Sequence, residues 1–546
     1  MKLSTKNAII YVVFLIVFLL PFKHIFAETV ATSVIVGNSA PSFTVQPFEV
    51  LASTTISPTN VGTTVTFQAT GTDGNNENYY LAICKTNAIT ANSNAAPTCT
   101  GGNWCISSSI TSGTAASCGY GTLQTDVESN AWYAFVCDYS ASSSCSTMAQ
   151  GSGDSASPFN INHAPTFGTI ANITPLSPGS TQTWSTAVGV SDADTGDLTR
   201  LVVCKTAGVS AAGACTGGTW CTSAGAANNP SCSIGISIPT LDIGYSAFVY
   251  VFDNHNFASS GSKQNTVSNY TVNNVSPVVS AITLNSGSDI SLSEGATTPI
   301  TLNATITDNN SCLDITTVVS SLYRSGVGYS ACDSGGEANS NNCYPVISCT
   351  VGSNTCDGFT DASASYTCTA YAKYYADPTD TNTTYSGQNW VDSFKASDEA
   401  LNDVQTIGSG VAMNSLLAMD IGSSLAFGNL SAGQTQTPLT SITSITATGN
   451  VGLDETIQGS DMSDGSGHTI TVGNQRYALA ASTAYASGVS LTTSAVESEL
   501  NCKKTTADVG ETKPTYWGIS IPNGTVAGTY SGTNTIIAVK GESAQW

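Results

Sequence analysis

The chain has 546 residues and a formal net charge of −22, a balance that repels nucleic acid and anionic lipid and excludes both as expected partners. Only 10% of the residues are charged and 41% are hydrophobic, which excludes an acidic disordered tail and predicts packed cores. The length predicts about three to five domains.

The N-terminal segment has the order of a secretory signal peptide. Lys2 and Lys6 precede an apolar run over residues 8–22, and Ala27 supplies a small residue at the expected cleavage site. The run is shorter than the roughly 20 residues of a membrane-spanning helix. We therefore expect cleavage after residue 27 and no membrane span in the mature chain, with an uncleaved anchor as the alternative. Cleavage would also remove Lys23 and change the net charge to −25.

Cysteine usage agrees with export. The chain has 17 cysteines, and all of them follow the predicted signal peptide. Such a number is typical of an oxidising exterior, where cysteines form disulfide bonds. We therefore expect an extracellular or cell-surface protein.

A repeated phrase predicts the domain organisation. Residues 38–43 (NSAPSF) return as residues 162–167 (NHAPTF) and, more weakly, as residues 274–279 (NVSPVV). Four further blocks recur in the same order in the first two copies, which indicates a duplication. These blocks are residues 80–86 and 201–206, 99–105 and 215–221, 117–118 and 231–232, and 134–136 and 247–249. The predicted parts are a signal peptide (1–27), a linker (28–40), three Ig-like modules (41–162, 163–275 and 276–405) and a C-terminal β-sandwich (406–546).

The fold class is predicted as all-β. Apolar and polar residues alternate over residues 63–69 and 301–306, and β-branched residues dominate both runs. Gly, Asn, Ser and Asp fill the gaps between such runs. Modules of roughly 100 residues match the size of a β-sandwich. Outside the signal peptide, residues 494–500 are the one stretch considered for a helix.

The repeat plan resembles the fibronectin type III-like and bacterial Ig-like repeats of large secreted bacterial and archaeal surface proteins. Residues 192–197 (DADTGD) resemble a loop of cadherin-like modules, and residues 517–522 (WGISIP) with 528–532 (GTYSG) are similar to the last sandwich of many such proteins. The resemblance covers most of the mature chain and is architectural. It implies adhesion, envelope structure or display, and a fold of this kind does not by itself establish a function.

The cysteines of the first two modules predict a shared pair of bridges. Tyr250 replaces Cys137 in the second copy and Cys145 has no counterpart, so Cys137 and Cys145 are expected to bond to each other. The four remaining positions allow three connectivities. The constant Cys-x5-Cys spacing favours a small inner loop and an outer bridge. This nested scheme pairs Cys99 with Cys105, Cys84 with Cys118, Cys215 with Cys221, and Cys204 with Cys232.

The other cysteines are left without a predicted pairing. Six belong to the third module and are expected to form bridges among themselves, namely Cys312, Cys332, Cys343, Cys349, Cys356 and Cys368. Cys502 is left over, either as a buried free thiol or as an intermolecular bridge. Structural zinc is not expected, because no Cys-x2-Cys pair is present.

Calcium is the one ion that the sequence suggests. Asp192, Asp194 and Asp197 place three hard oxygen ligands within six residues, a set that suits Ca²⁺. The alternative is a solvated Asx turn. The first module has only Asp73 and Gly74 at the matching place, which argues against a site shared by the modules. No other cofactor is expected.

No catalytic residues are predicted, and the chain is expected not to be an enzyme. Its few histidines are scattered, and no nucleophile elbow or phosphate-binding loop is present. The leading hypothesis is a structural or adhesive surface protein, whose partners would be cell-envelope components, glycans or other surface proteins. One alternative is an array of glycan-binding modules that uses Trp104 and Trp220. Another is an extracellular hydrolase with an unrecognised carboxylate site.

Overall fold

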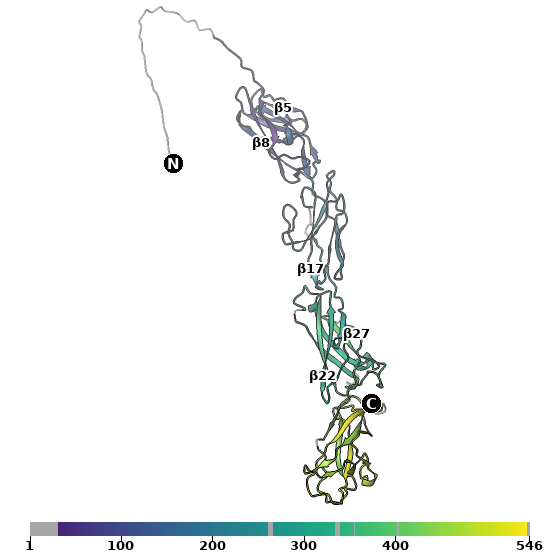
Figure 1. Cartoon of the computed structure of the whole chain (residues 1–546). Coiled ribbons are helices and arrows are strands. Elements are labelled where there is room, and N and C mark those ends of the chain that lie inside the picture. Colours follow the sequence, from purple (N-terminus) through teal and green to yellow (C-terminus); the bar gives the residue numbers. More distant parts are fainter. Residues whose placement is uncertain are drawn as a thin grey trace, which may run out of the picture. The chain divides into compact units, whose positions relative to one another are not determined.

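The protein is described by a computed structural model covering residues 31–259, 266–333, 339–353, 355–400, 403–422 and 424–542. The predicted signal peptide and its cleavage site lie outside these residues. The chain divides into two compact units, Met1–His163 and Ala164–Trp546, and each is described by itself. Both units are built from β-strands, so the chain is all-β as predicted (Figure 1).

The first unit is a disulfide-bonded β-sandwich. Its main antiparallel sheets have the orders β1-β3-β8 and β10-β4-β7, and a third sheet has the order β2-β11-β9. Alternating side chains of β3, such as Phe67, and of β4, such as Leu81, fill the core around the buried Trp132. The strands are β1 (Ser42–Glu49), β2 (Thr59–Asn60), β3 (Thr64–Thr72), β4 (Tyr79–Cys84), β5 (Ile89–Asn92), β6 (Ala95–Cys99), β7 (Asn103–Ile106), β8 (Ala115–Gly121), β9 (Ser129–Asn130), β10 (Tyr133–Asp138) and β11 (Phe159–Asn162).

The second unit begins with a sandwich of the same plan. The sheets β12-β13-β16 and β15-β14-β18-β19 enclose a core around Trp184, and β17 pairs with β20. The strands are β12 (Thr169–Asn172), β13 (Thr181–Val188), β14 (Arg200–Cys204), β15 (Thr219–Thr222), β16 (Ser231–Gly235), β17 (Gly244–Tyr245), β18 (Phe248–Phe252), β19 (Thr266–Val267) and β20 (Tyr270–Thr271).

The third module is one seven-stranded sheet folded around its own core. Its order is β21-β22-β25-β24-β23-β26-β27, and β21 also contacts β26 and β27, so the two ends of the sheet meet. Trp390 and Phe394 lie fully buried inside. The elements are β21 (Val278–Leu284), β22 (Thr297–Thr307), β23 (Ile315–Arg324), the short helix α1 (Tyr329–Asp333), β24 (Cys343–Val351), β25 (Ser363–Lys373), β26 (Trp390–Asp398) and β27 (Asp403–Ile407).

The C-terminal sandwich packs the sheet β28-β29-β36-β33-β34 against β35-β30-β37. The helix considered at residues 494–500 is wrong, because alternate residues of β35 are buried in this sandwich. The strands are β28 (Met419–Ile421), β29 (Ser441–Ala447), β30 (Leu453–Gly459), β31 (Met462–Ser463), β32 (Thr469–Ile470), β33 (Gln475–Ala478), β34 (Val489–Ser490), β35 (Val496–Cys502), β36 (Thr512–Ile519) and β37 (Asn534–Lys540).

The disulfide connectivity corrects the nested scheme. Consecutive cysteines are bonded instead, as Cys84–Cys99 and Cys105–Cys118 in the first module and Cys204–Cys215 and Cys221–Cys232 in the second. Cys137 is bonded to Cys145, the pair that the sequence comparison favoured. The third module has the bonds Cys312–Cys356, Cys332–Cys343 and Cys349–Cys368.

The two faces of β4 explain why the nested scheme fails. Cys84 points to an outer cluster that also holds Cys99, whereas Cys105 pairs in register with Ile83 and points into the inner core beside Cys118. Successive residues of a strand alternate between faces, so a Cys84–Cys118 bond would have to cross the sheet. The five residues between Cys99 and Cys105 therefore take the chain from the outer face of the sheet to its inner face.

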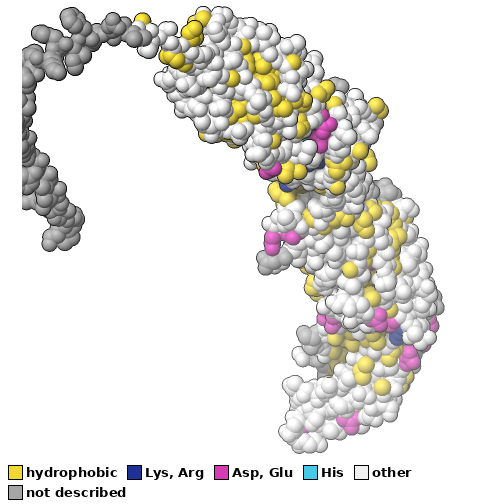
Figure 2. All heavy atoms as spheres, turned by 90° about the horizontal axis from the view of Figure 1, so that it is seen from above, with side chains coloured by type: hydrophobic (Ala, Val, Ile, Leu, Met, Phe, Trp, Pro, Cys, Tyr) yellow, Lys and Arg dark blue, Asp and Glu magenta, His cyan; other side chains and the backbone are white. Residues whose placement is uncertain are grey.

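The surface view shows how few charges the chain displays. On the face drawn in Figure 2, acidic side chains form a few small groups among polar and hydrophobic ones. No helix in the part of the chain that the structure describes is long and apolar enough to cross a membrane.

Cys502 is a buried free thiol, and burial raises its pKa to about 11.

Candidate calcium sites

Three carboxylate clusters occupy equivalent strand ends in the three Ig-like modules. In each cluster, one ligand oxygen from every member lies within 4.8 Å of the others. The clusters are Asp73, Glu77 and Asp138 (site 1), Asp192, Asp197 and Asp253 (site 2), and Asp308, Asp314 and Asp398 (site 3). Each site takes its first residue from the loop after β3, β13 or β22, and its last from the end of β10, β18 or β26.

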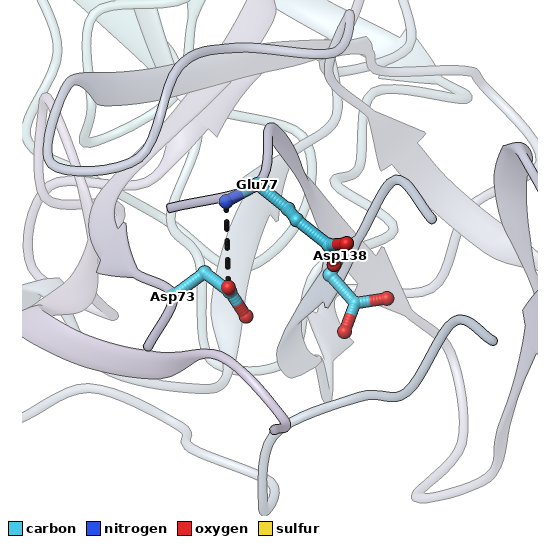
Figure 3. Close-up of side chains that lie close together, drawn as sticks. All are labelled: Asp73, Glu77 and Asp138. Carbon is cyan, nitrogen blue, oxygen red and sulfur yellow. Dashed lines mark hydrogen bonds between the residues drawn. The ribbon is translucent and has the colours of Figure 1, made fainter. Parts of the chain in front are cut away.

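Site 1 is formed by two turns that meet at one end of the first sandwich. Asp73 directly follows β3, Glu77 precedes β4 in the same turn, and Asp138 ends β10. The three carboxylates face a common space (Figure 3). Asp73 and Asp138 are buried, with 8% and 1% of their surface exposed. Oδ2 of Asp73 and Oε2 of Glu77 are buried and have no hydrogen-bond partner among the described residues.

The fixed backbone of the turn explains the orientation of Asp73. Its Oδ1 accepts hydrogen bonds from the backbone N–H groups of Asn75 (2.6 Å) and Glu77 (3.4 Å), which leaves Oδ2 directed toward the other carboxylates. Asp138 accepts a hydrogen bond of 2.8 Å from Nδ2 of Asn38, which belongs to the repeated phrase at the module entrance. Site 1 therefore joins the incoming chain to two strand ends of the sandwich.

Site 2 holds two of the three predicted residues. Asp192 and Asp197 belong to the cluster, and Asp253 rather than Asp194 is the third member. Asp194 instead donates its backbone N–H to Oδ1 of Asp192 at 3.0 Å. Burial, together with the neighbouring carboxylates, raises the pKa of Asp192 to about 6. Nε2 of His255 lies 3.4 Å from Oδ1 of Asp197.

Site 3 is the most buried of the three. Asp308 and Asp398 are fully buried, and Oδ2 of both Asp308 and Asp314 lacks a hydrogen-bond partner within the described ranges. Burial, and after it the charge of Asp308, raises the pKa of Asp314 to about 6. Asp242 of the second module adds to the negative field, because it also raises the pKa of Asp308 and Asp314.

A backbone hydrogen bond from residue i+2 recurs in all three sites. Asp308 accepts it from Asn310 at 2.7 Å, as Asp73 does from Asn75 and Asp192 from Asp194. Each first residue thus starts an Asp-x-Asn or Asp-x-Asp turn whose second carboxylate oxygen stays directed at the cluster. In the first module the sequence comparison considered only Asp73 and Gly74, whereas the structure also brings Glu77 and Asp138 to Asp73.

The spacing of the oxygens fits calcium. Ca²⁺ binds six to eight oxygens at about 2.3–2.6 Å, so ligands on opposite sides of the ion lie about 5 Å apart. In each cluster one oxygen of every member lies within 4.8 Å of the others, so a single ion of this size could contact all three. Three carboxylates held together without a counter-ion repel one another, and buried acceptors without partners are costly. A divalent cation removes both costs.

Sequence reasoning proposed two of these nine carboxylates as ligands, Asp192 and Asp197, and named Asp73 without assigning it that role. Asp138 ends β10 and Asp253 directly follows β18, the strands of the repeated AFV block, and Asp308 starts a turn of the same type as that of Asp192. The recurrence of Asp-x-Asn or Asp-x-Asp after the second long strand of each module was the available signal. The missed residues are Glu77, Asp138, Asp253, Asp308, Asp314 and Asp398. A fourth cluster, Asp454, Glu499 and Glu542, has two exposed members and no buried oxygen without a partner among the described atoms.

The two loop tryptophans have a packing role. The Trp104 ring lies edge-on to Tyr120 at 4.7 Å and to Phe159 at 4.9 Å, and Nζ of Lys85 lies 4.1 Å from the ring centroid. Trp220 has the same surroundings in the second module, with Tyr270 at 5.6 Å and Lys205 at 4.5 Å. Stacking a sugar on either ring would first displace the lysine that covers it.

Comparison with known proteins finds similarity among solved structures. No known protein family and no curated protein matches the sequence. Among solved structures, the mouse nectin-like molecule 4 ectodomain is 10% identical with a TM-score of 0.27, and covers 65% of this chain and 96% of its own. Protocadherin gammaB7 EC3-6 is 14% identical, with a TM-score of 0.26 and coverages of 87% and 99%. Fibronectin(III)-like modules of Clostridium thermocellum CbhA are 12% identical, with a TM-score of 0.18 and coverages of 39% and 86%.

These structure neighbours are Ig-like, fibronectin type III and cadherin-type proteins, and TM-scores this low support no inference about function. A bacterial or archaeal origin stays a prediction. The eight disulfide bonds of the described residues suggest an extracellular protein, because such bonds persist in oxidising compartments.

Proposed function

We propose that the chain is an exported, non-enzymatic surface protein with a structural or adhesive role, and that calcium binds at sites 1, 2 and 3. Export through cleavage after residue 27 is supported by the order of the N-terminal sequence and by the disulfide bonds. An extracellular location also suits weak calcium sites, since modules outside the cell work at millimolar calcium.

The observation that carries the proposal is the threefold recurrence of one arrangement. A solvated acidic turn accounts for the i+2 hydrogen bond, but it has no reason to gather three carboxylates and bury them together. In sites 1 and 3, moreover, residues that are more than nine-tenths buried direct an oxygen without a partner into the cluster. A cation of the size and charge of Ca²⁺ would offset the repulsion in these clusters and supply a partner for those oxygens.

Calcium at these positions would stiffen the entrance of each module. In the third module, Asn310 donates from Nδ2 to the backbone oxygens of Thr240 (3.1 Å) and Asn273 (3.0 Å), two residues of the second module. Its own backbone N–H is held by Asp308. An ion bound to Asp308 thus fixes the residue that connects the two modules. The function that follows is a spacer or adhesive array whose stiffness depends on calcium.

Isothermal calorimetry on the full mature chain tests the proposal. After removal of divalent ions, titration with calcium chloride is expected to show three bound ions per chain. Asp73→Asn, Asp192→Asn and Asp308→Asn should each remove one of them. Asp420→Asn is the matched control, because Asp420 is an exposed acid on β28 outside the clusters. An absence of binding at millimolar calcium, or an equal loss in the control, would contradict the proposal.

The partner is a separate question that localisation and binding assays address. We propose that the chain contacts envelope components, glycans or other surface proteins, and that its charge keeps it from nucleic acid. Cell fractionation should recover it outside the cytoplasm without Met1. On a glycan array, Trp104→Phe should bind the same glycans as the wild type, because the Trp104 ring packs against Tyr120 of the same module. Recovery only in membrane pellets with Met1 intact would refute cleavage and favour an anchor.

A further inference from the structure

A buried polar cluster joins the third module to the C-terminal sandwich inside the second unit. Nζ of Lys504, just after β35, donates to Oδ1 of Asn341 at 2.9 Å and to Oδ1 of Asp377 at 2.8 Å. Asn341 lies in the loop before β24, and Asp377 follows β25. The side chains of Lys504 and Asp377 are only 5% and 8% exposed. A lysine, an asparagine and an aspartate are thus in mutual contact across two modules.

We infer that Lys504 and Asn341 form an intramolecular isopeptide bond, with Asp377 as the proton carrier. The amide would connect Nζ of Lys504 to Cγ of Asn341 and make a covalent cross-link between the third module and the C-terminal sandwich. It is a modification of the folded chain that needs no oxidant, metal or second protein. The inference is independent of the calcium proposal, because none of its residues belongs to a calcium site.

Burial prepares the amine as a nucleophile. Loss of solvent lowers the pKa of Lys504, and the positive charge of Arg324 lowers it further, against the opposing effect of Asp377. Desolvated lysines supply neutral amines for attack on carbonyl groups. Nε of Arg324 holds Oδ2 of Asp377 at 3.2 Å, so Oδ1 stays directed at Lys504.

The hydrogen bonds of Asn341 orient its carboxamide for attack. The two groups on the far side of the carboxamide are oxygens that can only accept, so Nδ2 faces them and Oδ1 faces Lys504. Nδ2 then points the other way and donates to the backbone oxygen of Thr506 (3.0 Å) and to Oδ1 of Asn339 (3.1 Å). An amine in hydrogen-bond contact with Oδ1 lies within about 4 Å of the adjacent carbon, close to the 3–3.5 Å of a near-attack geometry.

The reaction balances with ammonia as the only other product. Oδ1 of Asp377 takes a proton from the amine of Lys504, and the nitrogen lone pair attacks Cγ of Asn341 to give a tetrahedral oxyanion at Oδ1. Asn341 and Asp377 both line the adjoining cavity, so the proton returns to Nδ2 through solvent there, the Cγ–Nδ2 bond breaks, and ammonia leaves. A cavity of about 460 Å³, lined by Asn342, Thr384 and Tyr385 among others, adjoins the cluster and gives ammonia a way out.

Mass spectrometry of the fully reduced full chain tests the bond. The wild type is expected to weigh about 17 Da less than its sequence, the mass of one ammonia. Lys504→Arg and Asn341→Ala should each restore the full sequence mass. Arginine keeps the positive charge beside Asp377, so that variant is expected to fold. Tandem spectra of a wild-type digest should show one branched peptide that joins Lys504 to Asn341.

Lys513→Arg is the matched control, since Lys513 pairs with Glu511 at 3.5 Å and lies outside the cluster. It should keep the deficit. A wild-type chain at its full sequence mass overturns the inference without any need for a variant. A deficit that persists in Lys504→Arg also overturns it, because such a loss would be a succinimide at an asparagine and not a cross-link.

Discussion

Replacement of Asp308 by asparagine is predicted to change stability in opposite directions with and without calcium. Asp308 is fully buried, and Oδ1 accepts from the Asn310 N–H while Oδ2 has no partner among the described residues. Asparagine can keep the hydrogen bond to Asn310, and it places a neutral amide beside Asp314 and Asp398. The substitution therefore removes repulsion from the apo site and a charged ligand from the calcium-loaded site.

The two magnitudes follow from the contacts. In chelator, removal of a buried charged acceptor without a partner is expected to stabilise the third module by about 1–3 kcal/mol. At calcium concentrations about 100 times the dissociation constant, the wild-type site gains about 2.7 kcal/mol that the variant largely loses. For a domain of this size, each kcal/mol changes the unfolding temperature by about 4 °C. The variant should melt several degrees above the wild type in chelator and several degrees below it in calcium.

Differential scanning calorimetry of the full chain is the appropriate assay. Modules that unfold in separate transitions give internal controls, because the first module does not contain Asp308. Asp420→Asn should leave the order of melting temperatures unchanged in both conditions. A variant that is less stable than the wild type in chelator as well as in calcium would refute the electrostatic reasoning, and would show that Asp308 is structural.

The remaining predictions concern pH and disulfide bonds. Calcium affinity should fall as the pH drops through about 6, because Asp192 and Asp314 then bind protons that compete with the ion; equal affinities at about pH 7.5 and pH 5 would contradict this. Burial raises the pKa of Glu455 to about 7, so the C-terminal sandwich should lose roughly 3 kcal/mol of stability as the pH rises from 4.5 through 7, and Glu455→Gln should abolish that contribution in urea unfolding. The double change Cys105→Ser and Cys118→Ser opens a loop of 13 residues and should cost the first module about 3 kcal/mol, whereas peptide mapping that joined Cys84 to Cys118 would overturn the connectivity.

The strand content was accessible to sequence because it depends on local pattern. Alternation at residues 63–69 predicted a strand that buries one face, and β3 buries alternate residues. The same alternation was overlooked at residues 494–500, where Val496, Ser498 and Leu500 are spaced by two. The stretch was too short to distinguish a strand from a helix by period alone.

The pairing of the cysteines depended on which face of a sheet each one occupies. The joint absence of Cys137 and Cys145 from the second module is a pattern in sequence, and it pointed to one bond. The Cys99-x5-Cys105 spacing misled, because it reflects a step between two faces of the sheet and not a closed loop. Spacing along the sequence does not tell on which face of a sheet a cysteine lies, unless the conformation of the connecting turn is known.

By itself, the sequence determined the all-β class, the repeats and the acidic loop at Asp192, since each depends on neighbouring residues. Only the tertiary structure decided which distant residues complete that loop, and Asp253 joins it because sandwich closure brings the end of β18 beside the loop after β13. Closure of the first sandwich placed Asp138 beside Asp73, and packing of the third module against the C-terminal sandwich placed Lys504 beside Asn341. No local period encodes either contact. Burial makes these contacts energetically important. Charged groups held together away from water are destabilising unless an ion neutralises them, their protonation changes or they form a covalent bond.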